Sequence, residues 1–387
     1  MSSLSLPRKT GLNLTHPYSV LVHPTHPRTT PFYIPISSPW VGFGETHPQP
    51  ETQWCYEMQR LEEETCIDHL PRVVSCGAAL FQWKGSWMFD ELFKAAMAMR
   101  NHFEPHPNDV ILTSFPKTGT TWLKALIYTI LHHDMPPEVS PGSVSAAAAD
   151  PLVSQNPHEL VPVFEFQIYP GNLHLLDQAP SHRIFQTHFA YELLPESIKR
   201  SSCKIVYVAR NPADTVVSLW QFSNRRSHGA NVSFKEAFDA FCEGTVAYGP
   251  FLDHVLGYWK ERKRVLFIMY EELKEDPYKH VTRLAKFLGR NLSEEQVTNI
   301  IWRCSLERLR NVKANRGRED IHWSGYPYEA FFRRGSVGDW KNHLTEEMIQ
   351  RLMGLTLKKL EGSRLQFKWE METTTTTTTA TDERRKN

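Results

Sequence analysis

The sequence lacks three features that would point to common classes of protein. It carries no excess charge, because 44 Lys and Arg residues balance 43 Asp and Glu residues and the formal net charge is +1. A near-neutral chain attracts nucleic acid and anionic lipid only weakly. It also has no run approaching the ~18 apolar residues that a transmembrane helix requires. We therefore expect neither nucleic acid nor a membrane as a partner.

Cysteine is sparse and follows no metal-binding or disulfide pattern. The six residues do not form a C-x-x-C pair and have no histidine pair at zinc-ligand spacing: Cys55, Cys66, Cys76, Cys203, Cys242 and Cys304. This distribution argues against a zinc site and gives only weak support to disulfides. We expect reduced thiols in a cytoplasmic protein.

The two ends of the chain lack the composition of a folded domain. The first 50 residues hold nine prolines and no acidic residue before Glu45, and Thr373–Thr379 is homopolymeric. Dense proline does not sustain helices or central strands. We expect a disordered Pro/His-rich extension over 1–57, one globular domain over 73–369 and a disordered poly-Thr tail over 370–387. A transit peptide, or a true start at Met58, remains an alternative for the first segment.

Between the ends, short β-rich apolar runs alternate with helical patterns. Strands are expected at 109–115, 183–188, 204–209 and 264–270, with helices beginning near 122, 212 and 277. A capping box at Ser293–Gln296 indicates a further helix. Continuous apolar strands are typical of a parallel sheet buried on both faces. The sequence predicts an α/β fold in which helices flank such a sheet on both faces, with ligands at the carboxyl ends of the strands.

The turn after the first of these strands has the composition of an oxyanion site. Pro116–Trp122 reads PKTGTTW, which places a lysine, a glycine and three threonines between a strand and a helix. Backbone N–H groups at such a helix start bind phosphate-like groups, and lysine adds a charge. The lysine precedes the glycine, so this is not the common nucleotide-triphosphate loop. No strand ends in an aspartate placed for Mg²⁺, which disfavours a metal-dependent NTPase.

Two further segments place basic residues where they could bind an anion. Arg210 directly follows a predicted strand, and Ser218 lies eight residues later in the next helix. Phe331–Trp340 reads FFRRGSVGDW, in which glycine allows the backbone to approach a ligand closely. Taken alone, Arg210 could equally form a surface ion pair, and the second segment could be a solvated basic loop.

These segments, in this order and spacing, resemble the cytosolic sulfotransferases. Within that family the sequence is most similar to the plant enzymes. The plant character rests on FQW at Phe81–Trp83, NPHE at Asn156–Glu159 and LEGS at Leu360–Ser363. The resemblance runs over about 73–367. It implies a P-loop-like fold and transfer of a sulfuryl group from 3′-phosphoadenosine 5′-phosphosulfate (PAPS) to a hydroxyl of a small acceptor, without a metal.

The resemblance also assigns roles to individual residues. It makes His188 the general base and Lys117 the residue that stabilises the leaving group. It places the 5′-phosphosulfate against Lys117, Thr118, Gly119, Thr120, Thr121 and Trp122, whose ring would meet the adenine. It places the 3′-phosphate against Arg210, Ser218, Arg333, Arg334 and Gly335, and the adenine near Tyr270.

The sequence departs from the family at three places. Gln186 stands where many animal members have a lysine near the sulfuryl group, and Leu306 stands where an aromatic residue is usual near the adenine. The segment after Trp340 lacks the end residues of the short dimer motif known in animal members. The sequence therefore leaves the oligomeric state open.

The acceptor is the least determined part of the prediction. Aromatic residues before and between the motifs are candidates for its pocket, although each could equally be core: Phe81, Trp83, Trp87, Phe164, Phe166, Phe189 and Tyr191. Collectively they favour an apolar or aromatic acceptor such as a flavonoid, steroid or hydroxylated hormone, with a desulfo-glucosinolate as a further class. A catalytically inactive nucleotide-binding member and a P-loop kinase using ATP are the alternative functions.

Overall fold

The computed structural model describes residues 67–133, 150–168, 183–226, 231–316 and 320–369. The two predicted terminal segments, 1–57 and 370–387, lie outside the described residues. No described helix is long and apolar enough to cross a membrane. The described cysteines, Cys76, Cys203, Cys242 and Cys304, are all free thiols.

The main sheet consists of four parallel strands in the order β5-β4-β6-β7. They span Val110–Ser114 (β4), Ile184–Thr187 (β5), Lys204–Ala209 (β6) and Val265–Met269 (β7). Every strand expected from the sequence is confirmed to within a residue or two at its ends. Because the strands are parallel, the turns that follow all four lie along one edge of the sheet.

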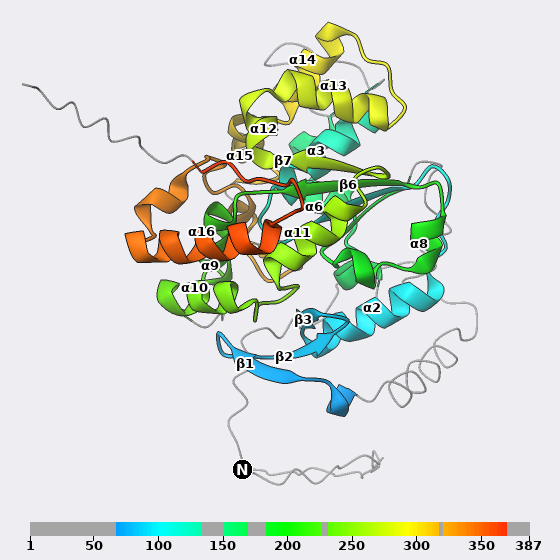
Figure 1. The fold of residues 1–387 in the computed structure, drawn as a ribbon. Coiled ribbons are helices and arrows are strands. Elements are labelled where there is room, and N and C mark those ends of the chain that lie inside the picture. Colours follow the sequence, from blue (N-terminus) through cyan, green and yellow to red (C-terminus); the bar gives the residue numbers. More distant parts are fainter. Residues whose placement is uncertain (1–66, 134–149, 169–182, 227–230, 317–319, 370–387) are drawn as a thin grey trace, which may run out of the picture.

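Both faces of this sheet are buried, as the continuous apolar strands predict. Alternate residues of β6 point to opposite sides: Ile205 and Tyr207 join one buried cluster, and Val206 and Val208 join the other. The first cluster is covered by α9 (Pro212–Ser223), α11 (Phe251–Lys260) and α16 (Glu346–Leu360). The second is covered by α3 (Thr120–Leu131), α13 (Pro277–Phe287) and α14 (Glu294–Arg303). Figure 1 shows the sheet between these helices.

Local sequence signals fix where several helices begin. The Asn211 side chain accepts a hydrogen bond from Ala213 N at 2.8 Å, and Pro212 occupies the first turn of α9. Ser293 and Gln296 form the predicted capping box of α14. The remaining helical segments are η1 (Ile67–His69), α2 (Asp90–His102), α5 (Pro151–Ser154), α6 (Pro157–Leu160), η2 (Phe164–Ile168), η3 (Tyr191–Leu193), α8 (Glu196–Arg200), α10 (Phe234–Glu243), α12 (Tyr270–Glu275), α15 (Leu306–Asn311), η4 (Tyr328–Phe331) and η5 (Asp339–Asn342).

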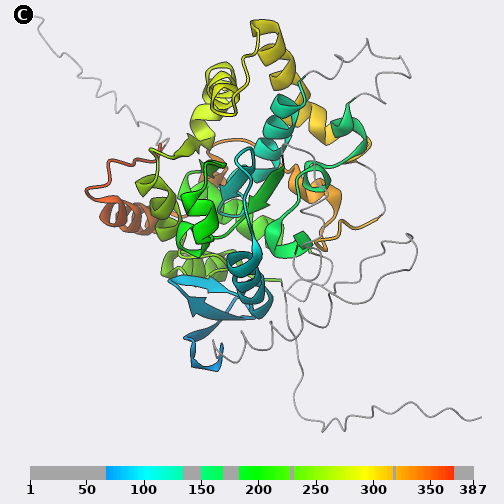
Figure 2. The ribbon, with the colours of Figure 1, turned by 90° about the vertical axis from the view of Figure 1, so that its right-hand side faces the viewer.

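A second, smaller sheet was not predicted. Its antiparallel strands are β1 (Arg72–Ser75), β2 (Ala78–Trp83) and β3 (Ser86–Met88), and α2 follows directly. Figure 1 and Figure 2 both show this sheet and α2 at one end of the molecule. Trp87 fastens it to the main body, because Trp87 N donates to Gly249 O at 2.9 Å and Tyr248 N donates to Trp87 O at 2.7 Å.

Candidate active site

The turn between β4 and α3 is held in shape by its own threonine and glycine. The Thr118 hydroxyl donates to the carbonyl oxygens of Phe115 and Val208, at 2.8 and 3.0 Å. Gly119 has φ +119°, and a Cβ there would lie 2.8 Å from Tyr270 Cδ2, so only glycine fits. The Thr118 hydroxyl therefore bonds to the backbone of the loop and of β6.

Lys117 places its ammonium group inside a cavity with other positive charges. Its Nζ lies 3.7 Å from the centroid of the Phe222 ring. Burial, together with the charges of Arg333, Arg210 and Arg225, lowers the pKa of Lys117 to about 7. A bound anion would raise the pKa of Lys117 and so restore its charged form.

Arg210, at the end of β6, is tied to the loop that carries Arg333. Arg210 Nη2 donates to Ser336 O at 2.7 Å and lies 3.4 Å from Asp214, while its Nε has no hydrogen-bond partner among the described residues. Arg333 pairs with the buried Asp339 at 2.6 Å. The two arginines thus come from distant parts of the sequence and reach the same cavity.

The loop around Gly335, in the C-terminal part of the sequence, forms part of the cavity wall. Tyr270 donates its hydroxyl hydrogen bond to Gly335 O at 2.9 Å, and its ring lies edge-on to Trp122 at 5.7 Å between centroids. Gly335 has φ +62° and a Cβ there would collide with Leu306, so glycine is favoured here as well. Arg334 pairs with Asp339 at 2.5 Å but leaves 58% of its side chain exposed.

His188 lies at the end of β5 and is fixed in one orientation. Its Nδ1 lies 2.8 Å from Ser114 O, which can only accept, so we assign the proton to Nδ1 and leave Nε2 as the basic nitrogen. Burial lowers the pKa of His188 to about 3, although the bond to Ser114 O opposes the shift, and Lys124, His254 and Lys117 add to it. The imidazole is therefore neutral at pH 7.

Two buried residues that the sequence analysis missed hold the backbone of His188. Glu165 Oε1 accepts hydrogen bonds from His188 N at 2.5 Å and from the Thr187 hydroxyl at 2.9 Å. His254 Nε2 lies 2.9 Å from His188 O, and its Nδ1 lies 2.9 Å from the Tyr207 hydroxyl. Burial raises the pKa of Glu165 to about 7. No spacing in the sequence links these residues to His188, because they come from separate elements.

His158 ties α6 to the start of α3. Its Nε2 lies 2.9 Å from the Thr121 hydroxyl and its Nδ1 lies 3.1 Å from Lys124 Nζ, which also donates to Val161 O at 2.9 Å. Asn156 fixes the backbone by accepting from His158 N at 2.9 Å. The NPHE motif was noted in the sequence only as a family signature, and its structural role is to position Thr121.

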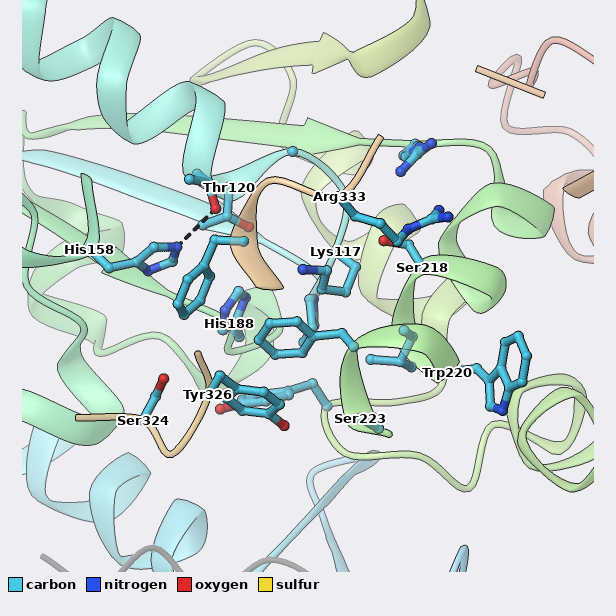
Figure 3. Close-up of a pocket in the computed structure, with 18 of the residues that line it drawn as sticks. Lys117, Thr120, His158, His188, Ser218, Trp220, Ser223, Ser324, Tyr326 and Arg333 are labelled. Atoms are coloured by element: carbon cyan, nitrogen blue, oxygen red, sulfur yellow. Dashed lines mark hydrogen bonds between the residues drawn. The ribbon is translucent and has the colours of Figure 1, made fainter. Parts of the chain in front are cut away.

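Many of these groups line one cavity of about 490 Å³. Figure 3 shows Lys117, His188, Tyr326 and Arg333 around it. The structure brings nearly every predicted site residue to its wall: Lys117, Gly119, Thr120, Thr121, Trp122, His188, Arg210, Ser218, Tyr270, Arg333, Arg334 and Gly335. Thr118 is the exception.

Comparison with known proteins identifies the family. The model of the sulfotransferase domain matches residues 107–364. Cytosolic sulfotransferase 17 of Arabidopsis thaliana is 41% identical over 297 residues, which cover 73% of this chain and 83% of that protein. Cytosolic sulfotransferase 16 of the same plant is 41% identical over 302 residues, covering 74% and 86%. The chain belongs to the sulfotransferase family.

Solved sulfotransferases share the fold. The crystal structure of an Arabidopsis thaliana sulphotransferase superposes with a TM-score of 0.63, at 33% identity over 80% of this chain and 97% of that one. Mouse sulfotransferase SULT7A1, solved in complex with PAP, gives a TM-score of 0.56 at 26% identity, covering 73% and 95%. This sulfotransferase is therefore not a P-loop kinase, and that alternative is set aside.

Most of the predicted acceptor aromatics of this sulfotransferase lie outside the cavity wall. Of the seven candidates, Phe166 alone lines the cavity. Phe164 packs edge-on against Phe103 at 4.7 Å between centroids, and Trp83 packs likewise against Phe93 at 5.3 Å. The remaining four, Phe81, Trp87, Phe189 and Tyr191, also lie outside the wall. The aromatic residues that line it with Phe166 are Phe89, Trp122, Trp220, Phe222, Tyr248, Tyr270, Trp323, Tyr326, Phe331 and Phe332.

Within the described residues of this sulfotransferase, no group of three or more His, Cys, Asp or Glu side chains is placed to hold a metal ion.

Proposed function

We propose that this sulfotransferase moves the sulfuryl group of PAPS to a hydroxyl of a small acceptor in a single in-line displacement. The observation that carries the proposal is that Lys117, Arg210, Arg333 and His188 line the same cavity. PAPS is strongly anionic, and this cavity offers cationic groups whose positive charges are close enough to lower the pKa of Lys117. The donor and the residues present therefore fit each other.

The donor would lie along the carboxyl ends of β4, β6 and β7. Backbone N–H groups at the start of α3 and the Lys117 ammonium group suit the 5′-phosphosulfate. The unpartnered Nε of Arg210 suits the 3′-phosphate, because guanidinium groups bind phosphate strongly. We assign the 5′-phosphosulfate to Lys117, Thr118, Gly119, Thr120 and Thr121, the adenine to Trp122 and Tyr270, and the 3′-phosphate to Arg210, Ser218, Arg333, Arg334 and Gly335.

In the reaction, the acceptor oxygen forms a bond to sulfur as the bond from sulfur to the bridging phosphate oxygen breaks. His188 Nε2 takes the proton of the acceptor hydroxyl, and Lys117 stabilises the negative charge that builds on the bridging oxygen. A bound anionic donor raises the pKa of both residues, because nearby negative charge favours their protonated forms. Gln186 adds no charge here, so stabilisation rests on Lys117.

Apolar and aromatic side chains make up much of the wall of the cavity that His188 lines, including Leu80, Phe89, Val163, Phe166 and Tyr326. This environment supports an acceptor with an apolar or aromatic body, such as a flavonoid, a steroid, a hydroxylated hormone or a desulfo-glucosinolate. The names of the curated relatives call them cytosolic, and we place this enzyme in the cytoplasm as well. We also retain 73–369 as its sulfotransferase domain.

The test is incubation with PAPS and a panel of plant phenols, steroids and hydroxylated hormones, followed by mass spectrometry for PAP and sulfated product. We expect product with at least one acceptor, unchanged by EDTA, and about 100-fold or greater loss of turnover in Lys117→Ala and in His188→Ala. Lys358→Ala, an exposed position on α16, is the matched control.

Two results would contradict the proposal. Tight binding of PAP without product from any acceptor would favour the inactive nucleotide-binding alternative. Full turnover in His188→Ala would remove that residue as the base.

A further inference from the structure

Gln186 is a fully buried polar side chain without an internal partner. It lies on β5, at one edge of the main sheet, is 0% exposed and lines the cavity. Neither its Oε1 nor its Nε2 has a hydrogen-bond partner among the described residues. Buried carboxamides are almost always hydrogen-bonded, so an orphaned one at a cavity wall points to a ligand that supplies the missing partners.

The position of Gln186 places its carboxamide beside the proposed base. Residues two apart on a strand point to the same side, and His188 follows Gln186 at this spacing. Both residues line the cavity. The backbone of Gln186 is fixed by pairing with Leu112 and by a hydrogen bond from its N to Pro162 O at 2.9 Å. Its side chain is therefore presented from a rigid strand.

Tyr248 lies on another side of the same base. Its ring centroid is 5.4 Å from that of His188, and its hydroxyl also lacks a partner among the described residues. The Tyr248 side chain is nearly buried, and Trp87 holds its backbone. Two unpartnered polar groups thus lie near His188.

The sheet order separates Gln186 from the groups proposed for the 3′-phosphate and the adenine. Arg210 follows β6 and Tyr270 follows β7, both on one side of β4, whereas β5 lies on the other side; the oxyanion turn follows β4 itself. The hydrogen-bonding groups of the carboxamide also argue against the sulfuryl or phosphate groups as its partner. Sulfuryl and phosphate oxygens at neutral pH only accept hydrogen bonds, which would leave Gln186 Oε1 unmatched. A neutral hydroxyl both donates and accepts, and so can pair with either end of the amide.

We propose that Gln186 recognises a second hydroxyl of the acceptor, close to the hydroxyl that is sulfated. This inference rests on the proposed function. The acceptor class that it selects has two neighbouring hydroxyls, as in an ortho-diphenol, on an otherwise apolar body. An acceptor with a single hydroxyl would leave the carboxamide buried and unpaired, which disfavours its binding.

The experiment compares 4-methylcatechol with 4-methylphenol, which differ by one hydroxyl next to the reacting position. With saturating PAPS, we expect kcat/KM of the wild-type enzyme to be at least about 10-fold higher for the catechol. In Gln186→Met, which keeps the length of the side chain but not its hydrogen bonds, this ratio should fall to near one through loss of catechol turnover. Gln350→Met is the control, because Gln350 is exposed on α16.

Binding of PAP, measured by calorimetry, separates this inference from the proposed function. We expect Gln186→Met to bind PAP as tightly as the wild-type enzyme does. A wild-type ratio near one, no turnover of the catechol, or an unchanged ratio in Gln186→Met overturns the inference even if PAP binds. Failure of the wild-type enzyme to bind PAP overturns the proposed function. If Gln186→Met does not fold, the inference is tested by the wild-type ratio of kcat/KM for the catechol to kcat/KM for the phenol.

Discussion

The cavity has a proposed donor half, around Lys117, Arg210 and Tyr270, and a proposed acceptor half, around Gln186 and Tyr248, with His188 between them. The two halves are built differently. In the donor half, polar groups are held by one another: Tyr270 donates to Gly335 O, and Asp214 accepts from the backbone N–H groups of Gly338 and Trp340. In the acceptor half, Gln186 and Tyr248 present buried polar atoms without partners among the described residues. The donor half is thus largely organised by its own hydrogen bonds, with the Nε of Arg210 left for the ligand, whereas Gln186 and Tyr248 in the acceptor half both depend on the ligand to complete their hydrogen bonds.

The largest effect is expected where the two halves meet, at His188. In His188→Ala, turnover should fall by about 100- to 10,000-fold, because the proton of the acceptor hydroxyl loses its base. Single-turnover measurement with bound PAPS isolates this step. Binding of PAP should not change, and His106→Ala, an exposed position, should behave as the wild-type enzyme. A matching loss of PAP binding would show that His188 belongs to the donor half.

The next largest effect tests the donor half alone. Arg210→Ala should weaken PAP about 10- to 100-fold, because a charge-assisted hydrogen bond to the 3′-phosphate is lost. The affinity for 5′-AMP, which lacks that phosphate, should change little. Calorimetry with both nucleotides measures the difference, and Arg262→Ala, at an exposed position, is the control. Equal loss of affinity for the two nucleotides would contradict the assignment.

A smaller effect tests the acceptor half. Tyr248→Phe removes one unpartnered hydroxyl and should raise the KM of a hydroxylated acceptor by about 3- to 10-fold, the usual effect of one hydrogen bond. PAP affinity should stay constant. Tyr278→Phe, at an exposed position on α13, controls for the substitution itself. If Tyr248→Phe weakens PAP and leaves the acceptor KM unchanged, the division between the two halves is wrong.

The smallest effect is a change in bound protons. The pKa of Lys117 is lowered to about 7 in the empty enzyme, so at pH 8 the amine is mostly neutral. An anionic ligand raises that pKa, so PAP binding at pH 8 should take up at most about one proton. Calorimetry in buffers of different ionisation enthalpy measures the uptake, which Lys117→Met should abolish. Uptake that persists in Lys117→Met would assign it to another group.

The same shift predicts how stability depends on pH. The unfolded chain binds the Lys117 proton up to about pH 10.5, the ordinary value, whereas the folded enzyme releases it near pH 7. The unfolded state therefore holds more protons across this range, and the contribution of Lys117 to the free energy of unfolding increases as pH rises from 7 to 10.5.

The sequence brought together the residues proposed for the donor because its signals for them are local. PKTGTTW lies within one strand-to-helix turn, and Arg210 directly follows a strand whose apolar run is continuous. Thr118 is the predicted site residue that does not line the cavity, and the direction of its hydroxyl follows from the left-handed backbone of the loop at Lys117 and Gly119. A residue pattern does not reveal which side of such a turn a hydroxyl faces.

The acceptor half could not be predicted because segments that are far apart in the sequence form it. The small sheet contributes Leu80, and its strands are too short to give a clear period. Tyr326 reaches the cavity by stacking on Phe222, at 3.9 Å between centroids and across about a hundred residues of sequence. Aromatic content alone singled out Phe164 and Trp83, which pack in the core or against α2. Their placement is a property of tertiary packing.

The most direct test of this account is calorimetric binding of PAP to the acceptor-free enzyme in EDTA, compared with ATP in the presence of Mg²⁺. An already organised donor half predicts that PAP binds without metal and without acceptor, about 100-fold or more tightly than ATP, because Arg210 and Arg333 select the 3′-phosphate. Binding of Mg·ATP as tight as that of PAP, or binding of PAP only when an acceptor is added, would contradict it.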